Sequence, residues 1–551
     1  MISLHSHSFY SLLRGTIPYR KLIDLNKSYG AKSAALTDDN GMYGLIQFAR
    51  YALEENIKPI LGSFIDDPKD DRLNAVFIAR NNSGYSELCK LITTRRLDEN
   101  FSLVNVINND ISNFFVLSSS LPLLEKIHIT DIIRKSLFIE LIDTKSRNSL
   151  NSSLQYFADN NSLRICASHP VYFLSKEDFL LHKVMGAIRT NATLENLDEQ
   201  ILVDKEFYYR SPVELENKWS SLPEAVENAE YIERNCNVDL NFGTYKFPDF
   251  PLPPDETAYS LLWKICFKGL ESRYSSINDN VIKRLQYELE VIDELGFCDY
   301  FLVVWDIVRE ARSREMVTIG RGSAANSLVS YCLGLTQVDP IEHNLYFERF
   351  LNRGRTSPPD VDLDFSWKER DEIVKYVFEK YGYDKVAMIS TTVTFRARSA
   401  FRETAKVFGI PDGEISKYSK FIPWTSAHNL PVLAQKFPEA KSLKFDTEPW
   451  KSVIDIASKL SSFPRHLSIH PGGIVITSNP ITNYVALEYA KNKGVGIIIT
   501  QPDMYPIEDL GLIKIDLLSQ RSLGVLRDTL GRVNEGRNPG SDKGNIFNIE
   551  E

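Results

Sequence analysis

The sequence predicts a multidomain α/β protein, and three observations support this fold class. The chain has 551 residues, which is too long for one hydrophobic core and suggests about three or four domains. Up to about residue 240, short apolar runs such as "KPILG", "NAVFIAR" and "SLFIELI" alternate with helical stretches. This rhythm is typical of βα units, so we expect a mainly parallel sheet or a β/α barrel there. A proline-rich linker at residues 241–257 then separates this region from the rest.

Composition excludes several classes of protein. With 43% hydrophobic and 25% charged residues, the chain is globular rather than disordered. Its formal net charge of −9 argues against coating nucleic acid by bulk charge, although a local basic surface can exist within an acidic total. Six scattered cysteines form no zinc-type spacing, and neither a leader nor a long apolar run is present. We therefore expect buried thiols, a cytoplasmic protein and no membrane insertion.

Two further segments have distinct patterns. Residues 281–297 place Ile282, Leu285, Leu289 and Ile292 at helical spacing, and Gly296 should end this amphipathic helix. Residues 392–471 contain 12 Lys or Arg against 7 Asp or Glu. This segment is basic within an acidic chain, so it is either a nucleic-acid surface or an exposed helical face.

The segment "PPDVDLDF" spaces Asp360, Asp362 and Asp364 two residues apart, with apolar residues between them. In a strand, all three carboxylates would point to one face. Such a face needs protons or cations to neutralise it, and Mg²⁺ is a natural candidate because it prefers oxygen ligands. A solvated strand face or a calcium loop is the alternative. A further acid, Asp516 in "GLIKIDLLS", lies in an apolar run with Lys514 two residues earlier.

A glycine-containing turn could bind phosphate. In "IGRGSAANS", Gly320 and Gly322 permit close backbone approach, and Arg321 and Ser323 precede the expected helix "AANSLVSYCL". The amides at the start of that helix would form an anion site. A plain helix-start turn is the alternative. Arg349, in "FERFL", could add a forked contact to phosphate oxygens.

These motifs together resemble a known family. The stretch from "ELGFCDYFLVVWDIVREARSREMVTIGRGSAANS" to "PPDVDLDF", followed by "HPGGIVIT" and "GLIKIDLL", closely resembles the palm and thumb of the bacterial C-family DNA polymerases, the family of DNA polymerase III alpha subunits. The N-terminal "LHSHSFYSLLRGT" and "AALTDDNGMYGLIQF" resemble that family's polymerase and histidinol phosphatase (PHP) domain. Asn326 and "FPRHLSIHPGG" are similar to its shorter error-prone branch.

The resemblance implies a PHP-type β/α barrel at residues 1–240, a palm of the DNA polymerase beta-like nucleotidyltransferase type at 241–391 and 472–551, and a mainly helical thumb at 392–471. It also implies two Mg²⁺ ions, primer-template DNA and deoxynucleoside triphosphates as partners, with the sliding clamp as a partner of a full-length protein. The implied site residues are, for catalysis and metal, Asp360, Asp362 and Asp516; for the nucleotide, Arg321, Gly322, Ser323, Arg349 and Lys514; and for DNA, Arg396, Arg398, Arg402, Arg465 and His466. Asp364 matches an acid that is not a metal ligand in the family.

The PHP resemblance is incomplete. His5, His7, Asp38 and Glu140 match PHP metal ligands, whereas Asp39, Pro170 and Tyr172 stand where ligands are expected. A metal site that lacks several ligands loses affinity and geometry together, so we expect a structural PHP domain. His169 could substitute for one ligand, although a lone histidine at a strand end is more often only hydrogen-bonded.

A second departure concerns length. The chain ends about 35 residues after Asp516, whereas the family continues there into a fingers domain. We interpret the chain as a fragment, a split gene product or a form that cannot polymerise unaided. The leading hypothesis is template-directed DNA polymerisation by two-metal nucleotidyl transfer. The alternatives are a PHP-based metal-dependent phosphoesterase or 3′-5′ exonuclease, and a primer-template binding module without turnover.

Overall fold

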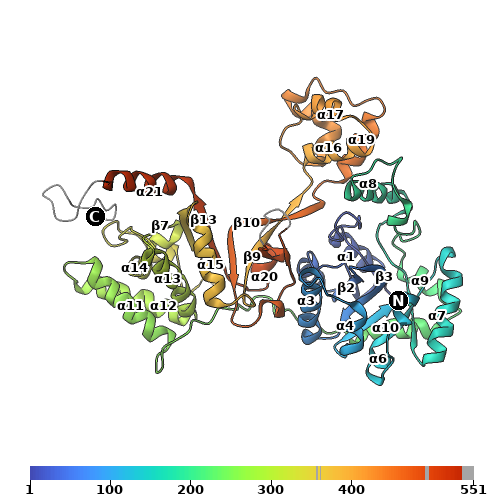
Figure 1. Cartoon of the computed structure of the whole chain (residues 1–551), viewed down its shortest axis with the longest axis horizontal. Coiled ribbons are helices and arrows are strands. Elements are labelled where there is room, and N and C mark those ends of the chain that lie inside the picture. Colours follow the sequence, from blue (N-terminus) through green and yellow to red (C-terminus); the bar gives the residue numbers. More distant parts are fainter. Residues whose placement is uncertain (355–357, 360, 491–495, 536–551) are drawn as a thin grey trace. The chain divides into compact units, whose positions relative to one another are not determined.

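The computed structural model describes residues 1–354, 358–359, 361–490 and 496–535, which are shown in Figure 1. The chain forms two compact units. Unit 1 contains Met1–Asn241, Ser390–Ser468 and Thr482–Pro506, and unit 2 contains Phe242–Ile389, Ile469–Ile481 and Ile507–Glu551.

Unit 1 is built on a six-stranded sheet with its strands in sequence order. The pairs β1–β2, β4–β5 and β5–β6 are parallel, and β3 is antiparallel to both of its neighbours. The prediction of a mainly parallel sheet is therefore correct for three of the five pairs. The link between β2 and β3 is too short for a parallel crossover, which explains the antiparallel hairpin. The strands are β1 (Ser33–Leu36), β2 (Lys58–Asp67), β3 (Asp70–Ala79), β4 (Phe114–Ser118), β5 (Leu137–Ile142) and β6 (Arg164–Ser168).

The N-terminal segment joins the two edges of this sheet. Thr37, just after β1, donates its backbone N–H to Ser6 O at 2.8 Å. On the other side, His7 N donates to Val171 O at 2.8 Å, shortly after β6. Residues 5–7 thus lie between the chain segments that follow the first and last strands. This arrangement fits the expected PHP-type barrel, and it places His5 and His7 inside the fold.

Helices cover the sheet. Helix α3 contacts β2 and β3, α7 contacts β5, and α10 contacts β6. The helices before residue 241 are α1 (Tyr19–Ser28), α2 (Leu45–Glu54), α3 (Asn82–Leu97), α4 (Leu103–Asn109), α5 (Leu121–Leu124), α6 (Asp131–Ser136), α7 (Asn148–Asn161), α8 (Phe179–Thr190), α9 (Pro212–Lys218) and α10 (Pro223–Asn235).

The basic segment folds into helices that pack against α8. Leu181 and Met185 of α8 share one buried cluster with Phe401 and Ile454, and Figure 1 shows α16, α17 and α19 grouped beside α8. The expected mainly helical structure of this segment is thus observed. Its helices are α16 (Ala397–Val407), α17 (Asp412–Ser419), α18 (Leu433–Lys436) and α19 (Trp450–Lys459).

The second sheet has the strand order β11-β12-β9-β10-β13-β8-β7. Strands β9 (Val386–Thr394) and β10 (Pro464–Ile476) each run from one unit into the other. Within unit 1, β11 (Leu487–Tyr489) pairs antiparallel with β12 (Ile498–Asp503). Within unit 2, β8 (Asp362–Ser366) is parallel to β13 (Lys514–Gln520) and antiparallel to β7 (Thr318–Arg321).

The predicted amphipathic helix is α12, which spans Asp279–Glu294, and Gly296 follows it with φ +72°. The remaining helices are α11 (Ala258–Arg273), α13 (Cys298–Ser313), α14 (Leu328–Cys332), α15 (Arg370–Tyr381), α20 (Met504–Asp509) and α21 (Arg521–Asn534). All six cysteines are buried free thiols, as expected. Among the described residues, no helix has the length and apolar character needed to cross a bilayer.

Buried histidines should make the fold sensitive to acid. Burial lowers the pKa of His182 to about 4 from the usual 6.5, and burial does the same to the pKa of His169. Between these pH values the unfolded chain binds more protons, so the free energy of unfolding falls as the pH drops from 6.5 towards 4. Each histidine should contribute a loss of about 2 kcal/mol between pH 7 and pH 5.

Urea unfolding of the whole chain at pH 7 and pH 5 measures this effect. We expect His182→Gln to reduce the loss between the two pH values, whereas His128→Gln, at an exposed position, should leave it unchanged. Equal losses in both variants would contradict the assignment.

Candidate functional site

The acidic residues lie in one row across the sheet of unit 2. On neighbouring strands, Gly473 is in register with Asp516, Asp516 with Asp362, and Asp362 with Arg321. Adjacent strands in a sheet are roughly 4.8 Å apart. The pairing therefore brings two of the predicted catalytic aspartates side by side, although they are far apart in the sequence. Asp360, the third, lies outside the described residues.

The two faces of these strands differ as the alternation predicts. Leu363 and Phe365 of β8, and Ile515 and Leu517 of β13, are buried. Asp362 and Asp364 alternate with the apolar residues of β8, and Lys514 and Asp516 alternate with those of β13. The apolar residues anchor the strands in the core, so the charged residues share the opposite face.

Two cations partly balance the charge of this acidic face. Arg321 Nε lies 3.8 Å from Asp362 Oδ2 and 3.5 Å from Asp364 Oδ2. Lys514 Nζ donates to Asp516 Oδ2 at 2.7 Å. Gln520 Nε2 is also close to Asp364 Oδ1, at 3.4 Å. Asp364 thus has a contact role that the sequence pattern did not assign: it holds Arg321 beside Asp362.

The residues fit a divalent cation. Asp516 Oδ1 is buried and has no hydrogen-bond donor among the described residues. A buried carboxylate oxygen without a donor is costly, and a cation would compensate it. The described residues contain no group of three or more His, Cys, Asp or Glu side chains arranged for a metal. Asp362 and Asp516 are therefore the two described candidates, because Mg²⁺ commonly uses one or two carboxylates together with substrate phosphates.

The glycine turn differs in part from the prediction. Gly322 has φ +78°, a conformation that favours glycine, and Gly320 approaches Leu335 O so closely that a Cβ would lie 2.0 Å from it. The expected single helix is divided into a 3₁₀ helix, η4 (Gly322–Asn326), and the short α14. Ser327, with an extended backbone, separates them.

The amides at the start of α14 are already occupied. The buried carboxylate of Glu288 accepts hydrogen bonds from Val329 N at 3.0 Å and Ser327 Oγ at 2.8 Å. Arg284 Nε donates to the other oxygen of Glu288 at 2.6 Å. The start of α14 therefore cannot bind a ligand anion, because an internal carboxylate uses it. The predicted helix "AANSLVSYCL" begins at Ala324, within η4, so the expected anion site at its first amides stays a prediction. Phosphate contacts remain possible at the Gly322–Ser323 turn itself.

Arg349 lies near that turn. It ends the 3₁₀ helix η5 (Phe347–Arg349), which packs against η4. Arg349 is exposed. The structure thus places Arg349, Arg321, Gly322 and Ser323 on neighbouring elements of one unit.

The five predicted DNA-binding residues have different environments. Arg398 donates to Ile422 O at 2.7 Å, Arg402 to Ser419 Oγ at 3.1 Å, and Arg465 to Glu403 at 2.6 Å. Arg396 instead stacks over Trp424, with 5.2 Å from its guanidinium carbon to the ring centroid. His466 is partly exposed, and burial lowers its pKa.

Exposed side chains add to the basic surface of these helices. Trp424 is 84% exposed, which is unusual for a tryptophan. The exposed lysines of the same segment are Lys417, Lys420, Lys436, Lys441, Lys444, Lys451 and Lys459.

The candidate PHP ligands make internal hydrogen bonds. His5 Nδ1 is 2.7 Å from Glu140 Oε1, which also accepts from Ser168 Oγ at 2.7 Å. Burial opposes ionisation of Glu140, but His5 and Ser168 together keep its pKa below the usual value. Asp38 accepts from Ser8 N, Ser8 Oγ and Ser11 Oγ, all within 2.8 Å. Burial nevertheless raises the pKa of Asp38 to about 6.

Two of the three residues that stand at expected PHP ligand positions contact each other. Tyr172 donates its hydroxyl to Asp39 Oδ1 at 3.2 Å, and its ring stacks on His7 with 3.8 Å between centroids. Arg14 Nε lies 3.8 Å from Asp39 Oδ2. His169 Nε2 is 2.9 Å from Tyr208 O, which agrees with the simpler of its two interpretations. The ring of Tyr172 thus lies against His7, and the guanidinium group of Arg14 lies near Asp39.

His470 lies beside the row of Asp516, Asp362 and Arg321, and the sequence pattern assigned it no role. His470 Nδ1 accepts from Gly473 N at 2.7 Å, and it lies 3.6 Å from Asp516 Oδ1. Because Nδ1 is an acceptor, the proton of the neutral ring is on Nε2. Burial lowers the pKa of His470, and this outweighs the effect of Asp516. The only sequence signal is its place in "HPGG".

Comparison with known proteins finds similarities for both regions. The model of the bacterial DNA polymerase III alpha NTPase domain family matches residues 260–519, and that of the PHP domain family matches residues 3–125. A DNA polymerase III subunit alpha of Bacillus subtilis is 32% identical over 98% of this chain and 50% of its own length. An error-prone DNA polymerase of Symbiobacterium thermophilum is 30% identical over 97% of this chain and 52% of its own length. The chain spans about half the length of the curated relatives it matches.

The buried contact between His5 and Glu140 should contribute strongly to stability. We expect Glu140→Ala to lower the free energy of unfolding by about 3 kcal/mol, because it leaves His5 and Ser168 without a buried partner. Glu140→Gln should cost less, since it retains an acceptor. Guanidinium unfolding of the whole chain measures the change, with Glu125→Ala at an exposed position as the control. A loss below about 1 kcal/mol in Glu140→Ala would contradict this assignment.

Proposed function

We propose that the chain is the PHP, palm and thumb portion of a DNA-directed DNA polymerase, because the models of the bacterial DNA polymerase III alpha NTPase domain and of the PHP domain match residues 260–519 and 3–125. In this proposal residues 1–240 form the PHP domain, residues 241–391 and 472–551 the palm, and residues 392–471 the thumb. The observed units change at residues 241/242, 389/390 and 468/469, close to these boundaries, and also at 481/482 and 506/507, so Thr482–Pro506 of the proposed palm belongs to unit 1.

The row Asp516–Asp362–Arg321 carries the proposal. It combines two carboxylates in register on parallel strands with a cation at each side, Arg321 and Lys514. Nucleotidyl transfer requires carboxylates for divalent ions and cations for the triphosphate, all held on rigid strands. Two Mg²⁺ ions bound by Asp362, Asp516 and Asp360 would activate the primer 3′-hydroxyl and neutralise the leaving pyrophosphate.

The cations of the row then act on the nucleotide. Arg321 is held beside the carboxylates by Asp364, so its guanidinium is already oriented when a triphosphate enters. Lys514 supplies a point charge next to Asp516. Arg349 and the Gly322–Ser323 turn lie on adjacent elements and would contact the remaining phosphate oxygens.

The helices of residues 392–471 would hold the primer-template. Phosphate contacts come mainly from Lys and Arg, and the exposed lysines named above suit that role. Arg398, Arg402 and Arg465 also have internal partners, so they would contribute through the charge of the surface as well as through direct contacts. Arg396 and Trp424 form an exposed cation–aromatic pair that can stack on a base or sugar. Primer-template DNA and deoxynucleoside triphosphates are thus the proposed substrates, and a sliding clamp is a proposed partner of the full-length protein.

We assign a structural role to the PHP residues. Asp39 and Tyr172 hydrogen-bond to each other at positions where ligands are expected, and Asp38 and Glu140 are bonded to serines and to His5. These contacts would stabilise the N-terminal fold, while His5 Nε2 and His7 Nε2 remain buried without a hydrogen-bond partner among the described residues. The proposed location is the cytoplasm, where a bacterial polymerase meets its DNA.

Primer extension with Mg²⁺ tests the palm assignment. We expect Asp362→Asn and Asp516→Asn to lower the extension rate at least about 100-fold, because each removes a charged metal ligand. Asp364→Asn should lose less than about tenfold, since it only orients Arg321. Comparable losses in all three variants would contradict the separate roles of these aspartates. If the unaltered chain binds primed DNA but extends no primer, it is a binding module, and the proposal of turnover by this chain is wrong.

The thumb assignment has its own test. Replacing Trp424 by Ala should weaken binding of a primer-template about tenfold, because stacking on a base contributes roughly 1–3 kcal/mol. Fluorescence anisotropy with labelled DNA at several salt concentrations measures the affinity. Tyr156→Ala is the matched control, since Tyr156 is also a strongly exposed aromatic residue, on α7. Equal affinities of the two variants would remove Trp424 from the DNA surface.

A further inference from the structure

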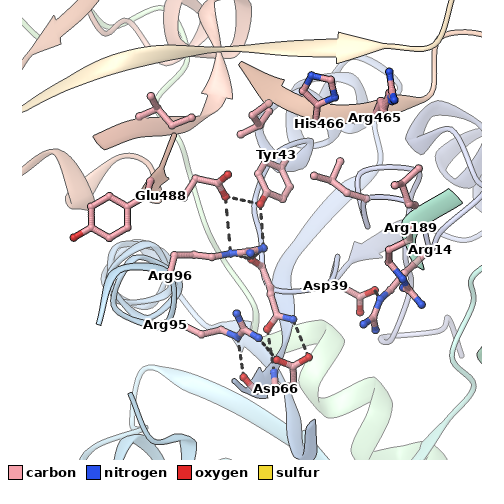
Figure 2. A pocket seen from close by; sticks show the side chains of 16 residues that line it. Arg14, Asp39, Tyr43, Asp66, Arg95, Arg96, Arg189, Arg465, His466 and Glu488 are labelled. Carbon is pink, nitrogen blue, oxygen red and sulfur yellow. Dashed lines mark hydrogen bonds and ion pairs between the residues drawn. The ribbon is translucent and has the colours of Figure 1, made fainter. Parts of the chain in front are cut away.

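Unit 1 contains a cavity of about 630 Å³ whose lining includes none of the four candidate PHP ligands but does include Asp39, which stands at an expected ligand position. Its walls come from the segments 12–14 and 39–43, the helices α3 and α8, and the strands β10, β11 and β12. Five arginines and three carboxylates line it, and Figure 2 shows them around one space. The cavity is thus rich in positive charge inside a chain whose net charge is −9.

Two of the arginines are neutralised by two of the carboxylates. Arg95 donates to Asp66 O at 2.8 Å and also forms an ion pair with the Asp66 carboxylate. Arg96 donates to Asn40 O at 2.9 Å and lies 3.9 Å from Glu488 Oε2. Arg95 and Arg96 therefore have partners within the protein, and these partners hold their side chains in place on one side of the cavity.

The other side has an excess of positive charge. Arg14 and Arg189 lie next to each other with a single carboxylate, Asp39, beside them (Figure 2). Arg189 donates its Nη2 to Ile201 O at 3.0 Å, but its buried Nη1 has no acceptor among the described residues. Burial and the neighbouring Arg14 lower the pKa of Arg189 to about 10, so it still carries its charge at neutral pH.

An unpaired buried donor and two adjacent guanidinium groups favour an oxyanion. Arginine binds tetrahedral phosphate through forked hydrogen bonds, and phosphate offers more acceptor oxygens than a carboxylate. The remaining lining contains His466, Arg465, which is paired with Glu403, and an apolar or aromatic part. A cavity of this size accepts a small organic molecule. The apolar or aromatic part of the lining consists of Leu12, Leu13, Tyr43, Leu467, Tyr489 and Ile499.

We propose that this cavity binds a nucleoside monophosphate, with the phosphate between Arg14 and Arg189 and the nucleoside against the apolar wall. The site is separate from the row of Asp362 and Asp516 and uses guanidinium groups in place of a metal ion. It therefore goes beyond the proposed polymerase function, and its ligand is a nucleotide that the palm does not process.

Isothermal titration of the whole chain in EDTA, with deoxyadenosine monophosphate as the probe, tests the proposal. We expect binding of this probe, weaker binding of inorganic phosphate and no binding of deoxyadenosine. Arg14→Gln and Arg189→Gln should each weaken the affinity at least tenfold, and Arg189→Lys should have an intermediate effect because it keeps the charge but loses the fork. Arg134→Gln, which changes a surface arginine paired with Asp131, is the matched control and should have no effect.

Variants of the palm separate this site from the polymerase proposal. Lys514→Ala should retain the affinity for deoxyadenosine monophosphate, and its loss would assign the binding to the palm and overturn the proposal. Unchanged affinity in both Arg14→Gln and Arg189→Gln, with thermal denaturation showing folded proteins, would also overturn it. Inorganic phosphate bound as tightly as the nucleotide would remove the nucleoside from the proposal. A single-stranded oligonucleotide bound more tightly, and lost in Arg189→Gln, would overturn it in favour of a DNA strand as the occupant.

Discussion

The parallel pairing of β8 with β13 is the constraint on which the candidate palm site depends. It places Asp362 beside Asp516 in register, and a slip of one residue would turn every carboxylate into the core and every apolar residue outward. Leu363, Phe365 and Leu517 are fully buried on the opposite face, so packing of the core sets the register. The geometry of the acidic residues is therefore a consequence of hydrophobic burial, not of the charges themselves.

Charge compensation is incomplete in the two acidic regions of the molecule. In unit 2, Arg321 and Lys514 balance the aspartates only in part, and Asp516 Oδ1 remains buried without a donor. Around Asp38 the carboxylate oxygens are bonded to serine groups. In the second region, however, His5 Nε2, His7 Nε2 and Asp39 Oδ2 are also buried without a hydrogen-bond partner among the described residues, so both regions contain polar atoms that are not satisfied from within.

The arginine cavity of unit 1 is a third place where charged side chains are only partly balanced by partners within the protein. Arg95 and Arg96 are balanced by Asp66 and Glu488, but Arg14 and Arg189 have one carboxylate beside them, Asp39, in the described part of the chain. Because a buried charge is stable only with a compensating partner, each imbalance marks a place for a ligand of opposite sign.

The sequence by itself determined the strands and helices whose periodicity is strong. It predicted α12, the alternation of β8 and the same-face placement of Lys514 with Asp516, because these depend only on local spacing. It also identified the family through its motifs. Tertiary structure alone decided which distant side chains meet. Four contacts illustrate this. Glu288 occupies the start of α14, and Asp39 contacts Tyr172. His470 lies beside Asp516, and Arg14 lies beside Arg189. Each contact joins segments far apart in the chain, and local spacing contains no information about such contacts.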